Sequence, residues 1–179
     1  MRKVLFILGQ LTDSDVDWLT TAGRKERVPA GKVLIQEHKK IEKLYIVLEG
    51  LLSVTDAHLG GREIARLEAG EIVGEMSFVS ADLPVATVTA LQDTQVLSLP
   101  TASLSVKLEQ DPGFAARFYR AIAVFLSDRL RATVGTLGYG EVQPPEDLDK
   151  LDENVLDNVH LAGARFERML KKLTINRVK

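Results

Sequence analysis

The chain has 179 residues with a formal net charge of −2 at pH 7, and 45% of its residues are hydrophobic. This length suits one domain with a modest extension, and the apolar fraction is enough for a real core. Because there is no cysteine, disulfides, thiolate metal sites and cysteine nucleophiles are excluded. The charge balance gives no basis for a nucleic-acid or anionic-membrane partner, since both need a clustered basic excess.

The N-terminal segment does not have the pattern of a signal peptide. Its apolar run, Val4 to Leu8, is too short, and an acidic stretch follows without a small-residue cleavage site. No other apolar stretch approaches the roughly 20 residues that span a bilayer. We therefore expect a cytoplasmic protein with no membrane partner. A short helix is expected after Thr12, whose hydroxyl caps it, with Asp15 in the first turn and Gly23 at the end.

The segment 28–100 is rich in short β-forming runs separated by glycine, aspartate or proline. Gly60–Gly61 is a strong hairpin signal between two of these runs. Many short strands at regular spacing favour a sandwich or a jelly-roll barrel. The expected strands lie within 33–35, 44–54, 63–67, 86–91 and 95–99.

After Pro100 the apolar residues recur three or four positions apart, which predicts helices. Asp111-Pro112 is a good start for a long helix over about 111–137. Residues 138–147 are a linker by composition. A last amphipathic helix is expected over 148–175, with apolar spacing that alternates four and three from Val155 onward, as in a coiled-coil seam.

Three separated segments resemble the cyclic nucleotide-binding domain family: residues 28–37, 43–54 and GEIVGEMSFVSADLPVATVTA at 70–90. The resemblance covers about residues 10 to 137, with motifs in the family's order. It implies a mostly β fold with flanking α-helices. That fold is a double-stranded β-helix, also called a jelly-roll or cupin-like barrel, and it would occupy about residues 28–100. The whole domain would cover residues 1–137, with a short helix before the barrel and a long helix after it.

In this family a glycine-glutamate pair, here Gly74-Glu75, opens a short helix of the phosphate-binding cassette. Free amides at a helix N-terminus attract a phosphate, and Met76 and Ser77 would supply them. By resemblance Glu75 would accept hydrogen bonds from a ribose hydroxyl of cyclic AMP or cyclic GMP. The resemblance places the nucleotide site at Gly74, Glu75, Met76, Ser77, Pro84, Val85, Ala86 and Thr87.

The cassette departs from the family at the phosphate-binding arginine, because that position falls on Pro84. No arginine occurs between Arg66 and Arg117. Loss of such a contact costs about 2–5 kcal/mol, which weakens binding roughly 30-fold to over 1,000-fold. Alternatives remain in which Gly74 only serves a tight turn and Glu75 only caps backbone amides in an empty pocket.

Sequence motifs for other chemistry are missing. A cupin metal site needs paired histidines and a carboxylate. The only histidines are His38, His58 and His160, and no two share ligand spacing. We expect each at the surface, with no metal site. There is no nucleophile elbow, P-loop or GxGxxG motif, so we expect no catalytic residue, no enzyme activity and no resident cofactor.

The two apolar helical faces after the barrel need burial. By resemblance the long helix pairs two protomers, while the alternative is that it packs only on its own barrel. The final helix joins the same dimer, docks a protein partner, or folds back so that Phe166 or Met169 occupies the nucleotide's place. Its basic residues are expected on a solvated face, and no second DNA-reading helix is present, so we expect no DNA partner. The expected homodimer contact contains Phe118, Ile122, Phe125 and Leu126.

These observations leave three hypotheses. The first is a regulatory binding module with weak, altered or absent cyclic nucleotide binding that acts through protein contacts. The second is a genuine nucleotide sensor that uses Glu75, Ser77 and backbone amides. The third is a structural oligomerisation protein whose barrel is only a scaffold.

Overall fold

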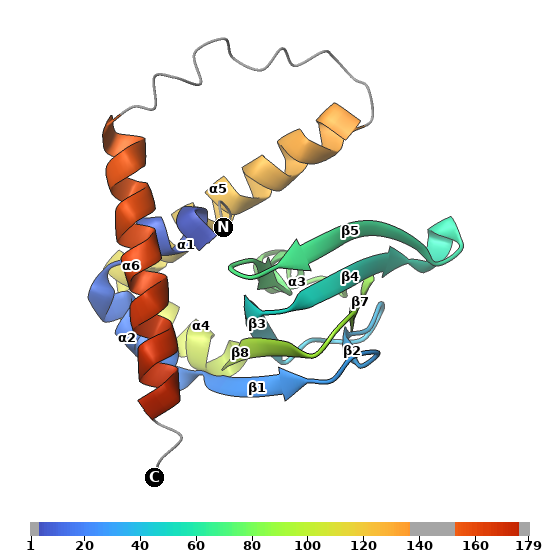
Figure 1. The fold of residues 1–179 in the computed structure, drawn as a ribbon, viewed down its shortest axis with the longest axis horizontal. Coiled ribbons are helices and arrows are strands. Elements are labelled where there is room, and N and C mark those ends of the chain that lie inside the picture. The colour runs from blue at the N-terminus through green and yellow to red at the C-terminus, as the bar shows by residue number, and fades with distance from the viewer. Residues whose placement is uncertain (1–3, 137–152, 176–179) are drawn as a thin grey trace.

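Two four-stranded antiparallel sheets form the centre of the computed structural model, which describes residues 4–136 and 153–175 (Figure 1). Seen edge to edge, the first sheet has the order β1-β8-β3-β6 and the second the order β2-β7-β4-β5. The first sheet contains β1 (Arg24–Val28), β8 (Thr94–Pro100), β3 (Lys43–Glu49) and β6 (Ile72–Val73). The second contains β2 (Val33–Ile35), β7 (Thr87–Ala90), β4 (Leu51–Asp56) and β5 (Arg62–Glu68).

The alternation of side chains along each strand gives the first sheet two buried faces. Successive side chains of a strand point to opposite faces, so Val47 and Val96 point toward the second sheet and Ile46 and Leu97 point toward the helices. All eight strands contribute to the core between the sheets. That core consists of Val28, Ile35, Val47, Leu52, Leu67, Val73, Val88, Ala90 and Val96.

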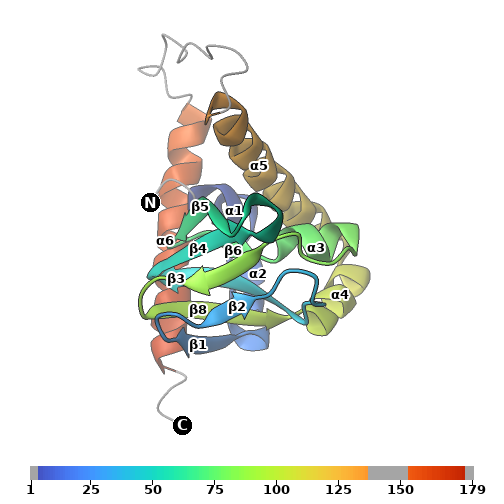
Figure 2. The same ribbon diagram turned by 90° about the vertical axis from the view of Figure 1, so that its right-hand side faces the viewer.

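Helices cover the outer face of the first sheet, as Figures 1 and 2 show. They are α1 (Val4–Gln10), α2 (Asp13–Ala22), α4 (Thr101–Gln110), α5 (Pro112–Thr136) and α6 (Glu153–Ile175). A capping box starts α2: Asp15 N–H donates to the Thr12 hydroxyl, and Thr12 N–H donates to the Asp15 carboxylate. Asp15 also accepts hydrogen bonds from Arg117, which ties α2 to α5. Among the described residues, no helix is long and apolar enough to cross a membrane.

The predicted strands are confirmed, and Gly60 and Gly61 lie at the end of the β4–β5 hairpin with positive φ angles. The long helix begins at Pro112 as expected. The elements that were not predicted are α1, α4, the charged strand β1, the two-residue strand β6 and a 3-10 turn over Ala57–Leu59. The predicted linker 138–147 and the predicted start of the last helix at 148 lie outside the described residues.

The α5 side chains that were predicted to make the dimer contact are buried within the single chain. Phe118, Ile122 and Phe125 belong to the core beneath the first sheet, and Leu126 packs against that core. In this structure the helix therefore packs on its own domain, which was the alternative expectation. A homodimer stays a prediction, and its contact would have to use other residues of α5.

The last helix, α6, lies against α1 and α2 (Figure 1). Met169 is fully buried and Phe166 is partly buried in the helical core, so neither of them fills a nucleotide's place. The expectation of a solvated basic face is wrong for Arg165, whose side chain is 14% exposed, whereas Arg168 and Lys172 stay solvent-exposed and pair with acids of α2. Arg165 pairs with Asp13, and Arg168 and Lys172 pair with Asp17.

Candidate functional site

The cassette helix α3 (Glu75–Ser80) follows β6 directly, and Gly74 makes the turn between them. Gly74 has φ 92°, in the left-handed region that favours glycine. A Cβ at this position would lie 3.1 Å from Ile41 Cδ1 and 3.3 Å from Ile35 Cδ1. Gly74 is therefore required both by the backbone turn and by the close packing of the cassette on the sheet.

The carboxylate of Glu75 is buried and is paired with an arginine of the same chain. Glu75 is 2% exposed, and Arg129 Nη1 of α5 donates to its Oε1 at 2.7 Å. Burial raises the pKa of the Glu75 carboxyl, and the positive charge of Arg129 opposes that rise. The Arg129 guanidinium also stacks on Phe125, 4.5 Å from the ring centroid. The residue that was expected to bind ribose is thus engaged by the long helix, which Figure 2 shows beside α3.

The remaining predicted site residues lie on α3 and on the segment that leads into β7. Met76 is 53% exposed and Val85 62% exposed, while Ser77 and Ala86 are intermediate. Pro84 is buried, and its carbonyl accepts a hydrogen bond from His38 N–H at 2.8 Å. Thr87 Oγ1 accepts a hydrogen bond from Glu37 N–H at 3.2 Å.

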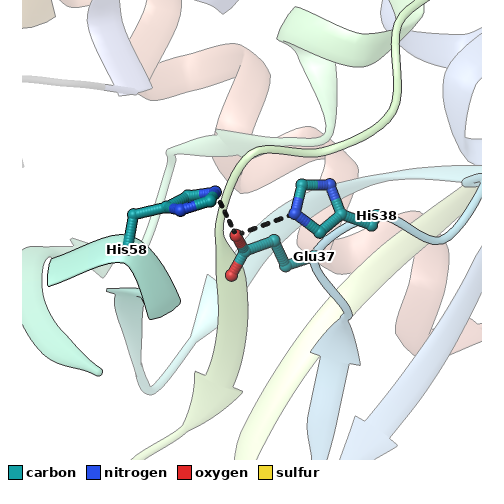
Figure 3. A group of neighbouring side chains, drawn as sticks. All are labelled: Glu37, His38 and His58. Atoms are coloured by element: carbon teal, nitrogen blue, oxygen red, sulfur yellow. Dashed lines mark ion pairs between the residues drawn. The ribbon is translucent and has the colours of Figure 1, made fainter. Parts of the chain in front are cut away.

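A second group of polar side chains lies beside the end of the cassette, made of Glu37, His38 and His58 (Figure 3). Their ligand-type atoms all lie within 4.8 Å of one another. The fold thus brings His38 and His58 together although they share no ligand spacing in the sequence, and both are exposed as predicted. They come from different segments: His38 follows β2, and His58 lies in the 3-10 turn η1 (Ala57–Leu59) between β4 and β5.

Sequence reasoning missed both Arg129 and the histidine pair because these contacts join distant segments. Glu75 and Arg129 are 54 positions apart. The only local signal for the second group was the hairpin at Gly60–Gly61, which brings the chain around near His58.

Comparison with known proteins relates both the sequence and the fold of this chain to cyclic nucleotide-binding domains. Residues 25–111 match the model of the family "Cyclic nucleotide-binding domain". The structure is similar to a cyclic nucleotide-binding domain from Methylobacillus flagellatus KT, with a TM-score of 0.67 at 21% identity over 76% of this chain and 83% of that one. Residues 25–111 of the chain therefore match a cyclic nucleotide-binding domain, and the fold agrees with that match.

Two further similarities come from bacterial proteins. The Cyclic AMP receptor protein of Thermus thermophilus is 32% identical over 91 residues, which are 50% of this chain and 42% of that protein. The N-terminal domain of a transcriptional regulator from Streptomyces coelicolor A3(2) is 29% identical, with a TM-score of 0.59 over 73% of this chain and 94% of that one. The chain thus spans less than half the length of this curated relative.

Proposed function

We propose that this protein is a non-enzymatic, cytoplasmic regulatory module whose cassette binds cyclic nucleotide weakly or not at all and which acts through protein contacts. One observation carries the proposal: the buried Glu75 carboxylate is already paired with Arg129. The cassette also has Pro84 where the family has its phosphate-binding arginine. The expected contact to the ribose and the expected contact to the phosphate are therefore both altered.

The energetic consequence is a competition inside the pocket. A neutral ribose hydroxyl that binds Glu75 has to replace a charge-assisted hydrogen bond, which is roughly twice as strong as a neutral one. Without a cation at Pro84, the phosphate gains only backbone amides and the dipole of the short helix α3. Such contacts at a helix end contribute about 0.3–1 kcal/mol each, which does not offset the loss.

Exposed apolar side chains on and after α3 support the role of protein contacts. Met76, Val79, Leu83 and Val85 are each about half exposed or more. Apolar groups that gather at a surface are typical of interaction sites. A ligand that shifted α3 would move these side chains, so the same surface could report the state of the pocket.

A genuine nucleotide sensor is the second candidate, and the backbone of the cassette favours it. Gly74 and α3 keep the turn-and-helix geometry that presents N–H groups to an anion. A relative, the Cyclic AMP receptor protein of Thermus thermophilus, carries cyclic AMP in its name. In this alternative, Glu75, Ser77 and the amides bind the nucleotide without a cassette arginine.

Calorimetric titration of the full chain with cyclic AMP and with cyclic GMP separates these candidates. We expect no saturable binding at micromolar concentrations for the wild type, and measurable binding for Pro84→Arg, which restores the cation. The expected gain is roughly 30-fold or more. Binding to the wild type at micromolar affinity or better, lost in Glu75→Gln, would favour the sensor instead.

We also propose the finer points of architecture and assembly. The strand orders β1-β8-β3-β6 and β2-β7-β4-β5 support a jelly-roll, in which two four-stranded sheets share one core. For a homodimer, α5 still exposes Tyr119 and Leu130, at 47% and 64%. Light scattering at tens of micromolar tests this assembly, and a strictly monomeric mass would exclude both the dimer and a purely oligomerising role.

A further inference from the structure

Three side chains of metal-ligating type converge from two segments of the second sheet (Figure 3). Glu37 and His38 lie in the turn after β2, and His58 lies in η1 at the end of the β4–β5 hairpin. In Figure 3 both imidazole rings point at the Glu37 carboxylate. His38 Nε2 lies 3.2 Å and His58 Nε2 lies 3.7 Å from Glu37 Oε1. The two rings come from opposite sides, with their centroids 6.0 Å apart.

Hydrogen bonds that use none of these three facing atoms hold the ligand residues in place. Glu37 Oε2 accepts a hydrogen bond from Ala57 N–H at 3.2 Å, which leaves Oε1 facing the imidazoles. His58 N–H donates to Asp56 Oδ1 at 2.7 Å. The backbone N–H groups of Glu37 and His38 donate to Thr87 Oγ1 and to the Pro84 carbonyl. These hydrogen bonds hold Glu37, His38 and His58 in place, as hydrogen bonds around metal-binding residues usually do.

Glu37 Oε1 is the feature that requires a further partner. The Glu37 side chain is only 7% exposed, and Oε1 accepts no hydrogen bond from any described residue. A buried carboxylate oxygen is costly unless it is paired, and His38 and His58 pair with this one only as imidazolium cations. Two imidazole nitrogens and one carboxylate oxygen that bind Zn²⁺ tetrahedrally, at about 2.0–2.2 Å, lie about 3.4 Å from one another. The observed separations of 3.2 and 3.7 Å bracket that value.

The backbone at His38 limits which substitutions can test the site. Its φ of 59° lies in the left-handed region, where asparagine and histidine are found more often than most other residues that carry a side chain.

We propose that Glu37, His38 and His58 form a binding site for a divalent first-row transition metal, with Zn²⁺ as the best match. Imidazole nitrogen with carboxylate oxygen suits Zn²⁺, Cu²⁺ and Ni²⁺, whereas Mg²⁺ and Ca²⁺ prefer all-oxygen ligands. Three protein ligands leave the remaining position for water or an outside ligand. The ion would join the turn after β2 to the end of the β4–β5 hairpin, next to the cassette residue Pro84.

Calorimetric titration of the metal-free full chain with Zn²⁺ tests the proposal. We expect one Zn²⁺ per chain and no comparable binding of Mg²⁺. Glu37→Gln, His38→Asn and His58→Gln should each weaken the affinity by more than about tenfold. Asparagine is chosen at position 38 because it tolerates the left-handed backbone. His160→Gln is the matched control, since His160 is exposed on α6 and should bind Zn²⁺ with wild-type affinity.

Hydrogen exchange gives a second readout that does not depend on the variants. Zn²⁺ should slow the exchange of amides in the turn after β2 and in the β4–β5 hairpin, and circular dichroism should show that each variant keeps the fold. The proposal is overturned if the wild type binds no Zn²⁺. It is equally overturned if His160→Gln loses binding while the variants at 37, 38 and 58 retain it.

Discussion

Removal of Arg129 should destabilise the fold through Glu75, because a buried carboxylate would lose its charge partner. Breaking a buried ion pair from one side costs about 3–5 kcal/mol. The Arg129 side chain is 30% exposed, so solvent screens part of its charge and we expect about 2–3 kcal/mol for Arg129→Met. For a chain of this length each kcal/mol lowers the melting temperature by about 2–4 °C. The expected loss is therefore about 4–12 °C.

The pH dependence of this loss has a definite sign. Burial raises the pKa of Glu75 in the fold, so the folded state binds a proton more tightly than the unfolded state. In the window between the unfolded and the raised folded pKa, stability from this group falls as pH rises. Because Arg129 opposes the rise in the pKa of Glu75, its removal raises that folded pKa further and widens the pH window. Arg129→Met should thus be most harmful at neutral pH and should recover as Glu75 becomes protonated.

A double-mutant cycle with Glu75→Gln, read by urea unfolding at neutral pH, isolates the pair. The neutral amide does not need a cation, so Arg129→Met should cost less in the Glu75→Gln background, with a coupling of about 0.5–3 kcal/mol. Arg131→Met should change stability by no more than about 0.5 kcal/mol. Additive effects of the two substitutions would refute the reasoning, because they would mean that the Glu75 charge does not depend on Arg129.

Two further predictions concern the packing of the scaffold. Gly50 has φ +111°, and a Cβ there would lie 2.7 Å from Thr94 Cα, so Gly50→Ala should cost more than about 2 kcal/mol in urea unfolding. Gly60→Ala, with φ +69° and open space, should cost only about 1–2 kcal/mol, and equal losses would contradict the argument. Hydrogen bonds from Arg168 and Lys172 lower the pKa of Asp17, so their stabilisation is full above about pH 4 and is lost as pH falls through the lowered folded pKa. Asp17→Asn should speed hydrogen exchange in α6 at neutral pH, and unchanged exchange there would show that these ion pairs do not hold the helix.

The sequence predicted the elements that carry their own periodicity. The β-branched alternation of β3, β4 and β8 was readable, and so was the long helix from Pro112. The strand β1 was missed because RKERV buries only Val28. It lies at the edge of its sheet, and edge strands carry charge to discourage pairing with other chains. The helix α1 was missed because seven residues with a glycine form a helix only when tertiary contacts stabilise it, here through Ile7 and Leu8.

The site was predictable only where its signal was local. Gly74-Glu75 and the substitution at Pro84 stand out in a single stretch of sequence. The partner of Glu75 and the meeting of Glu37 with His58 depend on how β4, β5 and α5 are placed in space. No spacing rule connects residues across a sheet turn or between two helices as far apart in sequence as α3 and α5, so these long-range electrostatic pairs had to come from the structure.

The position of Arg129 explains why one arginine on α5 does not simply replace the missing one of the cassette. A guanidinium that turned toward a bound phosphate would leave the buried Glu75 carboxylate with only a ribose hydroxyl. The phosphate contact would gain what the ion pair loses, since both are charge-assisted hydrogen bonds of similar strength. Two anions would then share one cation, so under the proposed function we expect the net affinity to stay low. Pro84→Arg supplies a second cation, so it should increase nucleotide affinity more than any change at Arg129 itself.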